Sequence, residues 1–301
     1  MRGVRRRFAP VLFWLLPILL AWVATGCRTA PPATFVRGQP LPLDDARASR
    51  VFDAYLEATV TRNALRGSAR VSLVGPDFKL NRPQNIVIER PARLRFEVIG
   101  LFEQLAAVLV SDGLHYGFYD AATGEMEQGP LTPTILWDLA RVDVGVGEAV
   151  GLLLGAPRPP AGGGRAAVWQ EADERIGLAF SRAGAPRPGE CGEPVERGWT
   201  DPACFSGPES LREGGDAFVF DRDGRLAELL AFDPDGVLRY RARFEEYRSL
   251  GDGADQGEFP NLVTIESLAA RSEARFAWKR VMLAGAIEER LFRLPERGTR
   301  W

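Results

Sequence analysis

Apolar and polar side chains alternate along much of the chain after Gly67, in short runs separated by turn-forming residues. Residues 69–74, 94–98 and 105–110 show this period of two clearly. It is typical of β-strands that bury one face, whereas an amphipathic helix repeats every 3.6 residues. The connections are too short for the crossovers that parallel strands need, so successive strands must run antiparallel. This pattern predicts an antiparallel meander of about ten or eleven strands.

Two Asp-Gly pairs, at residues 223–224 and 235–236, stand between further strand-like runs. Asp-Gly favours the tight turns that join two antiparallel strands, so both pairs predict hairpins. The strand-like runs in this half of the chain are 166–170, 175–181, 218–220, 226–232, 237–247, 262–268, 274–283 and 287–294.

Three segments replace the strand pattern with apolar residues at helical spacing. The first starts after Asp44 or Asp45, either of which can cap a helix, and runs to about Asn63. The other two are residues 132–142 and 147–154. A sheet with one apolar face must cover that face, and these helices can do so. If they cover it loosely, an apolar cavity remains beneath them. We therefore predict an α+β domain over residues 44–301.

The first 26 residues have the parts of a secretory signal peptide: four arginines, an apolar run with two prolines, and a small-residue end. Ala24, Thr25 and Gly26 before Cys27 resemble the lipobox of bacterial lipoproteins, in which the cysteine is acylated after cleavage. Arg28 at the next position resembles the outer-membrane class of these proteins. The alternative is an ordinary secretory signal with an incidental cysteine.

Cleavage after residue 26 would leave a mature chain that begins with a proline-rich tether, residues 27–43. The removed segment holds four of the 38 basic residues and none of the 40 acidic ones, which leaves 34 against 40 and a net charge of −6. We expect the N-terminal lipid to hold this chain on the outer membrane, facing the periplasm.

Cys191 and Cys204 are the two remaining cysteines, and they lie within residues 182–213, a stretch rich in Gly, Pro, Glu and Ser. We interpret this stretch as an insertion at a hairpin tip. In an oxidising compartment the two thiols are expected to form a disulfide, which closes a short loop and contributes about 3 kcal/mol in the chain-entropy model.

Catalytic and metal-binding patterns are missing from the sequence. It has one histidine, and no HExxH, GxSxG or GxxxxGK[ST] motif occurs. Ser111, Asp112 and His115 lie within five residues, whereas a catalytic triad is assembled from distant positions. A net charge of −2 and a pI near 5.8 give no basic footprint for nucleic acid. We expect no enzyme, no cofactor, no metal site and no nucleic-acid partner.

Three consecutive segments carry a resemblance to a known family: residues 90–98 (RPARLRFEV), 99–104 (IGLFEQ) and 105–113 (LAAVLVSDG). They resemble the outer-membrane lipoprotein carrier and receptor family, the LolA/LolB-like proteins. Residues 64–67 (ALRG) and 259–260 (FP), each beside an expected strand, are similar to it as well. The likeness spans most of residues 44–295, and the insertion at 182–213 departs from it.

This resemblance implies an incomplete antiparallel β-barrel wrapped over a few helices, with acyl chains bound in an apolar cavity. The implied role is to assist the localisation and insertion of lipoproteins into the outer membrane, with a periplasmic carrier protein as a possible partner. Leu101 or Phe102 falls where the family's receptor exposes an apolar residue to the membrane. The candidate cavity residues are Leu73, Phe96, Val98, Leu105, Val108, Tyr116, Phe118, Leu136 and Trp137.

Plainer interpretations remain open for these residues and for the whole chain. The cavity candidates fit an ordinary core, and the Leu101–Phe102 tip fits a turn tucked against a neighbour. The insertion could obstruct the mouth of the cavity. The chain could also be an envelope sensor that binds misfolded outer-membrane polypeptides or lipopolysaccharide, or a structural scaffold with a filled core.

Overall fold

The computed structural model describes residues 38–182, 214–234, 237–250, 257–267 and 270–294. Contacts divide the chain into Met1–Phe35 and one compact unit, Val36–Trp301. Every helix and strand described below belongs to that second unit.

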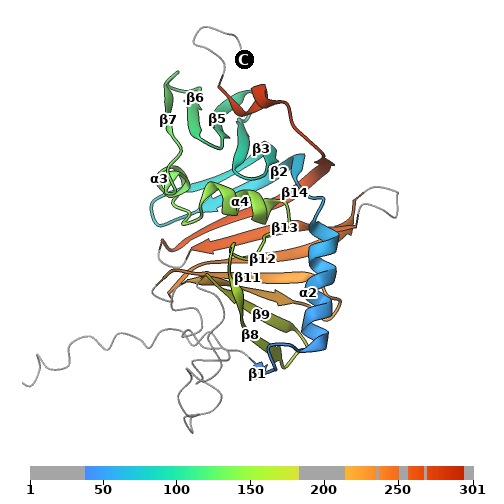
Figure 1. The fold of residues 1–301 in the computed structure, drawn as a ribbon. Coiled ribbons are helices and arrows are strands. Elements are labelled where there is room, and N and C mark those ends of the chain that lie inside the picture. The colour runs from blue at the N-terminus through green and yellow to red at the C-terminus, as the bar shows by residue number, and fades with distance from the viewer. Residues whose placement is uncertain (1–37, 183–213, 235–236, 251–256, 268–269, 295–301) are drawn as a thin grey trace, which may run out of the picture. The chain divides into compact units, whose positions relative to one another are not determined.

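The described strands form a single sheet whose neighbours are all antiparallel. Its order is β1-β8-β9-β10-β11-β12-β13-β14-β2-β3-β4-β5-β6-β7 (Figure 1). The strands are β1 Gly38–Pro40, β2 Ala64–Val74, β3 Lys79–Glu89, β4 Arg93–Ile99, β5 Leu105–Asp112, β6 His115–Asp120, β7 Met126–Pro130, β8 Gly164–Glu171, β9 Ile176–Ser181, β10 Gly215–Phe220, β11 Leu226–Phe232, β12 Leu238–Ser249, β13 Glu258–Ser267 and β14 Ser272–Ala284.

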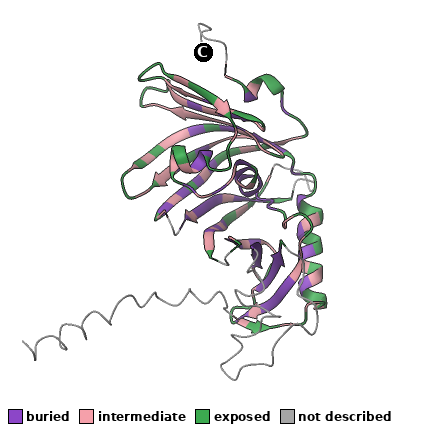
Figure 2. Cartoon of the chain, turned by 60° about the vertical axis from the view of Figure 1, so that its left-hand side comes forward, coloured by how far each residue is buried: buried purple, intermediate pink, exposed green. Residues whose placement is uncertain are grey.

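The expected α+β class and the open antiparallel sheet are confirmed, but the expected number of strands is wrong. The described residues form 14 strands, and the strands that the sequence pattern missed include β1 and β7, which are only three and five residues long. These two strands are the free edges, so the sheet does not close. The most buried strands are β9, β10 and β11, whereas β7 is largely exposed (Figure 2).

The strand predicted at residues 287–294 is also wrong, because this segment forms no strand. It contains the short 3-10 helix η3, Glu289–Phe292, which starts directly after Glu288. Ile287 and Phe292 pack in a small cluster with Ala64, and η3 contacts β4 and β5.

Three α-helices are described: α2 Ala46–Thr59, α3 Ile135–Ala140 and α4 Val146–Leu153. Asp45 caps α2, since its Oδ1 accepts hydrogen bonds from the backbone N–H groups of Arg47 and Ala48 at 3.0 and 2.9 Å. Phe52 and Tyr55 of this helix pack against the rings of Phe218 and Phe220 in β10. This part of the inner face is therefore filled with aromatic side chains.

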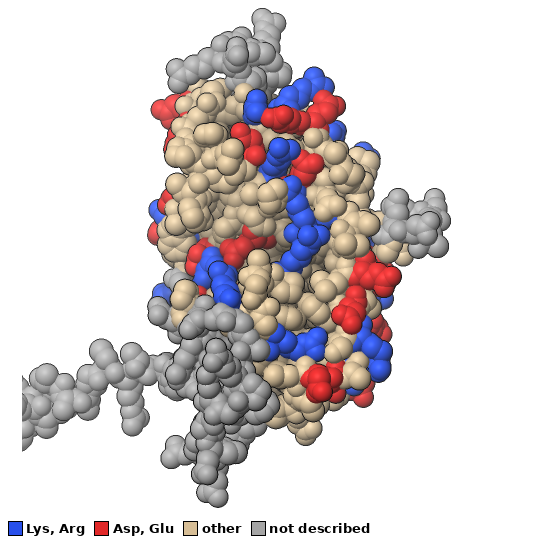
Figure 3. Space-filling model, in the orientation of Figure 1, with Lys and Arg blue, Asp and Glu red and all other residues tan. Residues whose placement is uncertain are grey.

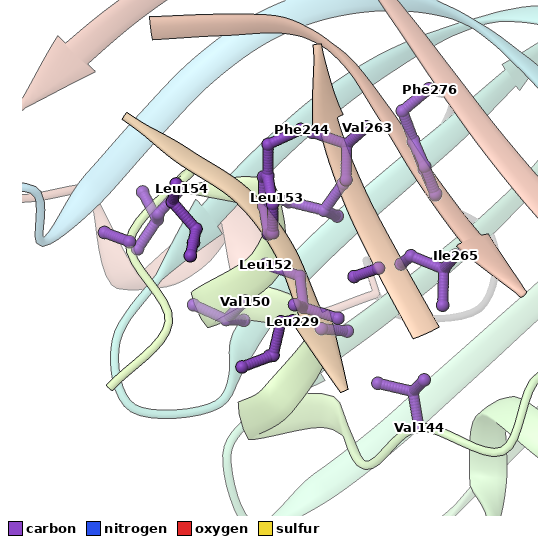
Figure 4. Close-up of a cluster of buried hydrophobic side chains, with 14 of the residues drawn as sticks. Val144, Val150, Leu152, Leu153, Leu154, Leu229, Phe244, Val263, Ile265 and Phe276 are labelled. Atoms are coloured by element: carbon purple, nitrogen blue, oxygen red, sulfur yellow. The ribbon is translucent and has the colours of Figure 1, made fainter. Parts of the chain in front are cut away.

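Helix α4 lies on the same face of the sheet as α2. Alternation along β10 places Asp216 on the face of Phe218 and Phe220, and the charge of Asp216 interacts with Glu148 of α4. Figure 4 shows Val150, Leu152 and Leu153 of α4 among apolar side chains of β11, β12 and β13. Helix α4 also borders an apolar cavity, which is lined by Ala149 and Leu153 of the helix.

Candidate functional site

A cavity of about 440 Å³ lies between the sheet and the segment that contains α3 and α4. Its walls come from seven strands, β2 to β6 with β13 and β14, and from the two helices with the link between them. The lining residues are Val71, Leu73, Leu80, Arg82, Gln84, Phe96, Val98, Ala106, Ala107, Leu109, Phe118, Asp120, Ala122, Leu136, Leu139, Ala140, Val142, Val144, Ala149, Leu153, Ile265, Ala274 and Phe276. All but three of these side chains are apolar.

The strand alternation explains the apolar floor of the cavity. Phe96 of β4 pairs with Leu109 of β5, and Leu109 pairs with Phe118 of β6, so the three side chains share one face. The ring of Phe276, from β14, lies 6.3 Å from that of Phe96. Residues far apart in the sequence thus form one continuous apolar surface.

The roof of the cavity is the segment from α3 to α4. Leu136, Leu139 and Ala140 line it from α3, and Ala149 and Leu153 line it from α4. Arg141 between the helices adopts a left-handed conformation, with φ 55°, and its carbonyl accepts a hydrogen bond from Ser272 Oγ of β14 at 2.5 Å. One side-chain contact therefore ties this link to the sheet.

Ion pairs hold the start of α4. Glu148 accepts a hydrogen bond from the backbone N–H of Gly145 at 2.7 Å, and it pairs with Arg239 of β12 at 3.2 Å. Arg239 also pairs with Asp143 at 3.4 Å, and these carboxylates raise the pKa of its guanidinium although its burial opposes this. The roof is thus anchored electrostatically at the same helix that borders the cavity.

Asp216 is a buried carboxyl beside this ionic cluster. Burial raises its pKa to about 7, with a smaller upward contribution from Glu148 that the charges of Arg182 and Arg239 oppose. Its Oδ1 is fully buried and has no hydrogen-bond partner in the described part of the chain. The folded protein therefore favours the protonated form of Asp216.

We expect Asp216 to make the stability of the fold depend on pH. In the unfolded chain an aspartate has a pKa near 3.9, so between about pH 4 and pH 7 only the folded state retains this proton. The free energy of unfolding should then fall as the pH rises, by up to about 1.4 kcal/mol per pH unit from this group. Urea unfolding at pH 5 and pH 8 checks this against Asp216→Asn, which should lack that part of the dependence. Parallel pH profiles for the two proteins would contradict it.

Five of the nine predicted cavity residues line the cavity: Leu73, Phe96, Val98, Phe118 and Leu136. The other four, Leu105, Val108, Tyr116 and Trp137, lie away from the wall.

The reasons for those four positions are local. Val108 alternates with the lining residues Ala107 and Leu109, so it faces the side of β5 on which η3 packs. Leu105 starts β5 beside a bulge after Val98. Tyr116 donates a hydrogen bond to Glu127 of β7.

Trp137, the fourth, packs with a basic side chain on α3. The guanidinium of Arg141 lies 6.0 Å from the centre of its ring. Leu136 is the neighbour of Trp137 in sequence, and it is the one that reaches the cavity. One step along a helix turns a side chain by about 100°, which separates the two directions.

Three polar residues of the wall were not predicted from the sequence: Arg82, Gln84 and Asp120. The signal that could have found Arg82 and Gln84 is the alternation of β3, in which they occupy the positions between Leu80 and Ile86. They share the face of these apolar neighbours because strand side chains repeat every two residues.

The turn between β4 and β5 exposes two large apolar side chains. Leu101 is 74% exposed and Phe102 is 88% exposed. The turn is closed by Gln104, whose carbonyl accepts from the N–H of Gly100 at 2.7 Å and whose Oε1 accepts from the N–H of Phe102 at 2.8 Å. The tip therefore projects into solvent and is not tucked against a neighbour.

A second hollow, of about 430 Å³, lies between α2 and the turn that joins β10 to β11. It is lined by charged residues such as Arg50, Arg222 and Glu258 together with Tyr55 and Tyr247. The face shown in Figure 3 carries positive and negative side chains interspersed among uncharged ones. This hollow is far more polar than the cavity beneath α3 and α4.

Several further expectations concern residues that the structure does not describe. Cys27, Cys191 and Cys204 lie outside the described residues, as do the signal segment and nearly all of the 182–213 insertion. The strands on either side of those residues, β9 and β10, are antiparallel neighbours in the sheet. In the described ranges no helix has the length and apolar character to span a membrane, and no group of three or more His, Cys, Asp or Glu is placed to hold a metal ion.

Solved structures similar to this chain include three bacterial proteins. A LolA superfamily protein from Nitrosomonas europaea is 10% identical, with a TM-score of 0.47 over 82% of this chain and 97% of that one. A putative outer membrane lipoprotein-sorting protein domain from Vibrio parahaemolyticus is 8% identical, with a TM-score of 0.48 over 81% and 97%. A DUF1329 family protein from Desulfovibrio piger is 8% identical, with a TM-score of 0.45 over 82% and 96%.

The first two of these names belong to the lipoprotein-carrier group that residues 90–113 resemble. No protein-family model matches the sequence, and the search of curated proteins found no match. Sequence identities of 8–10% do not identify a ligand, so the ligand is inferred from the shape and chemistry of the cavity.

Proposed function

We propose that this chain is an envelope lipoprotein that binds acyl chains in the cavity beneath α3 and α4, and that it assists the localisation of lipoproteins to the outer membrane. The observation that carries the proposal is the apolar cavity of about 440 Å³, whose wall has only three polar residues. A volume of this size is in the usual range for a small-molecule site, about 300–1,000 Å³. The proposed role is binding and transfer, not catalysis.

The physical need for such a cavity follows from the chemistry of acyl chains. Each methylene exposed to water costs about 0.8 kcal/mol, so a long chain cannot cross an aqueous compartment unprotected. A wall built from Phe96, Leu109, Phe118 and Phe276 can shelter a chain from water.

The anchoring scheme belongs to the same proposal. Residues 1–26 would be removed as a signal peptide, Cys27 would carry the lipid, and the residues between Cys27 and β1 would tether the domain to the outer membrane, facing the periplasm. The predicted tether ended at residue 43, but residues 38–40 belong to the sheet as β1. Cys191 and Cys204 would form a disulfide within the β9–β10 connection. The resemblance to the lipoprotein-carrier group and the sequence before Cys27 support this scheme.

Binding of an apolar fluorophore tests the function. The chain from residue 28 onward contains the whole unit that begins at Val36, and it lacks the acylated cysteine. We expect this protein to bind the fluorophore saturably, with one site per chain, and a fatty acid to displace it. Fluorescence titration measures both. An absence of saturable binding would overturn the proposal and leave the sensor or scaffold interpretations.

The exposed tip gives a second, separate expectation. Replacing Leu101 and Phe102 together by serine removes the two large apolar side chains that project from the β4–β5 turn. Binding in solution should be unchanged, because neither residue lines the cavity. Delivery of bound ligand to phospholipid vesicles should slow, by about tenfold or more, since burying such a side chain is worth about 1.5–3 kcal/mol. Stopped-flow transfer assays compare the two proteins, and equal transfer rates would show that the tip has no membrane role.

A further inference from the structure

Two polar side chains, Arg82 and Gln84, stand on the inner face of β3 within the otherwise apolar wall. Gln84 is only 5% exposed. In the described part of the chain, no side-chain hydrogen bond of Gln84 and no ion pair or hydrogen bond of Arg82 occurs. Arg82 is partly exposed, and no atom of either side chain is among the fully buried polar atoms that lack a partner. Both side chains therefore offer hydrogen-bond donors to the open space of the cavity and not to a protein acceptor.

Other inward-facing arginines of the chain do have partners. Arg62 donates hydrogen bonds to the carbonyls of Gly155 and Glu258, and Arg90 donates to those of Arg62 and Ala156. Arg239 pairs with Asp143 and Glu148. Arg82 differs from all three, since it borders open space and not a protein acceptor.

The sheet register arranges the polar groups at one end of the cavity. Gln84 pairs with Val98, Val98 with Ala107, and Ala107 with Asp120, so these residues form one row across β3 to β6. The next row, toward the other ends of these strands, is Ile86, Phe96, Leu109 and Phe118. Arg82 lies one step beyond the polar row, in the direction of the β4–β5 turn.

This arrangement has the polarity of an amphiphile. An acyl chain can lie on the row of Phe96, Leu109 and Phe118, while its head reaches Arg82 and Gln84. Both side chains donate hydrogen bonds, and a guanidinium matches the geometry of a carboxylate or phosphate. Asp120 stands at the far end of the row, and its Oδ1 accepts from the N–H of Ala122 at 2.8 Å. Its negative charge disfavours an anionic head at that end, which leaves the β3 end.

We propose that the cavity binds an acyl chain with an anionic head, whose carboxylate or phosphate is held by Arg82 and Gln84. This rests on the proposed function in that acyl chains must enter the cavity, and it adds a class of ligand, because a fatty acid or a phospholipid carries the anionic group that the acylated cysteine of a lipoprotein lacks. The end that holds the head is the end from which Leu101 and Phe102 project. A ligand bound in this way faces the membrane-contact tip with its polar group.

Three ligands with the same 16-carbon chain test the proposal by displacement of an apolar fluorophore at pH 8. They are palmitate, lysophosphatidylglycerol and monopalmitoylglycerol, which carry a carboxylate, an anionic phosphate and a neutral head. We expect the anionic ligands to bind about tenfold more tightly than the neutral one, as for a hydrogen bond to a charged group. Comparing the affinities of palmitate and lysophosphatidylglycerol shows whether the site prefers the carboxylate of a fatty acid or the phosphate of a phospholipid.

The variant Arg82→Gln should lose about tenfold in affinity for the two anionic ligands relative to its own affinity for the neutral ligand, which removes the preference. Arg70→Gln is the matched control, because Arg70 lies on the opposite face of β2, exposed, and donates a hydrogen bond to Asn81. It should keep the preference for anionic heads. Retained fluorophore binding shows that each variant is folded.

Two results would overturn the inference and leave the proposed function standing. One is equal affinity of the unmodified protein for all three ligands. The other is a loss in Arg82→Gln that affects neutral and anionic ligands alike. If the fluorophore itself does not bind to the unmodified protein, the proposed function fails and this inference fails with it.

Discussion

Replacing Phe96 by glutamate should weaken binding of an apolar ligand at least 100-fold. Phe96 lines the cavity, and its ring lies 6.3 Å from that of Phe276, which also lines it. The substitution removes about 1.5–3 kcal/mol of apolar contact and adds a charge that the ligand would have to dehydrate. Together the lost contact and the cost of dehydrating the charge exceed the free-energy change of about 2.7 kcal/mol that a 100-fold loss of affinity requires. Fluorophore titration measures it directly.

The matched control is the same substitution at Phe102. That side chain is 88% exposed at the β4–β5 turn and does not line the cavity, so Phe102→Glu should leave the affinity in solution unchanged. Both variants add one negative charge to the same hairpin. Equal losses in the two proteins would indicate a nonspecific effect of charge and would remove the assignment of the cavity as the binding site.

Replacing Phe52 by alanine should reduce the free energy of unfolding by about 3–5 kcal/mol, the usual range for a buried phenylalanine. Phe52 is 5% exposed, and its ring lies 4.7 Å from that of Phe180 and 5.8 Å from that of Phe218. Such a loss is a large part of the 5–15 kcal/mol, roughly, that stabilises a typical domain. The midpoint of urea unfolding checks it.

Two comparisons make this prediction specific to the α2 contact. Asp53→Ala alters an exposed neighbour on the same helix, and it should change stability by less than about 0.5 kcal/mol. Ligand affinity of the folded Phe52→Ala protein should be unchanged, because α2 supplies no residue to the cavity wall. A weak effect of Phe52→Ala on unfolding would show that α2 is not held by this aromatic cluster.

The helices divide between two tasks that the sequence did not distinguish. All three were expected to cover the apolar face and to form the lid of a cavity. In the structure α2 packs its aromatic side chains against β9 and β10, while α3, α4 and their link border the apolar cavity. The rings of Phe180, Phe218 and Phe220 pack against Phe52 of α2, whereas Phe96, Phe118 and Phe276 line the cavity opposite a roof segment of mainly Leu, Val and Ala.

Local patterns were sufficient for much of the fold. The period of two predicted the long strands, and the turn with Leu101 and Phe102 was placed between two antiparallel strands. Asp44 or Asp45 was predicted as a helix cap, and in the structure the cap is Asp45. These features depend on neighbours within a few residues, so one stretch of sequence contains all the physics they need. Short edge strands such as β1 and β7 escape this approach because three to five residues hold too little pattern.

The sequence by itself thus determined which residues of a strand share a face and where the turns lie. It also determined that the sheet has an apolar face that other elements must bury. Only the tertiary structure decided which face encloses the cavity: β2 pairs with β14, about 200 residues later, and η3 covers the outer side of β5. That is why Leu109 borders the cavity while Val108 does not, and why Arg82 and Gln84 face an apolar space. Pairing between distant strands is selected by the packing of the whole sheet, and no single segment contains that information.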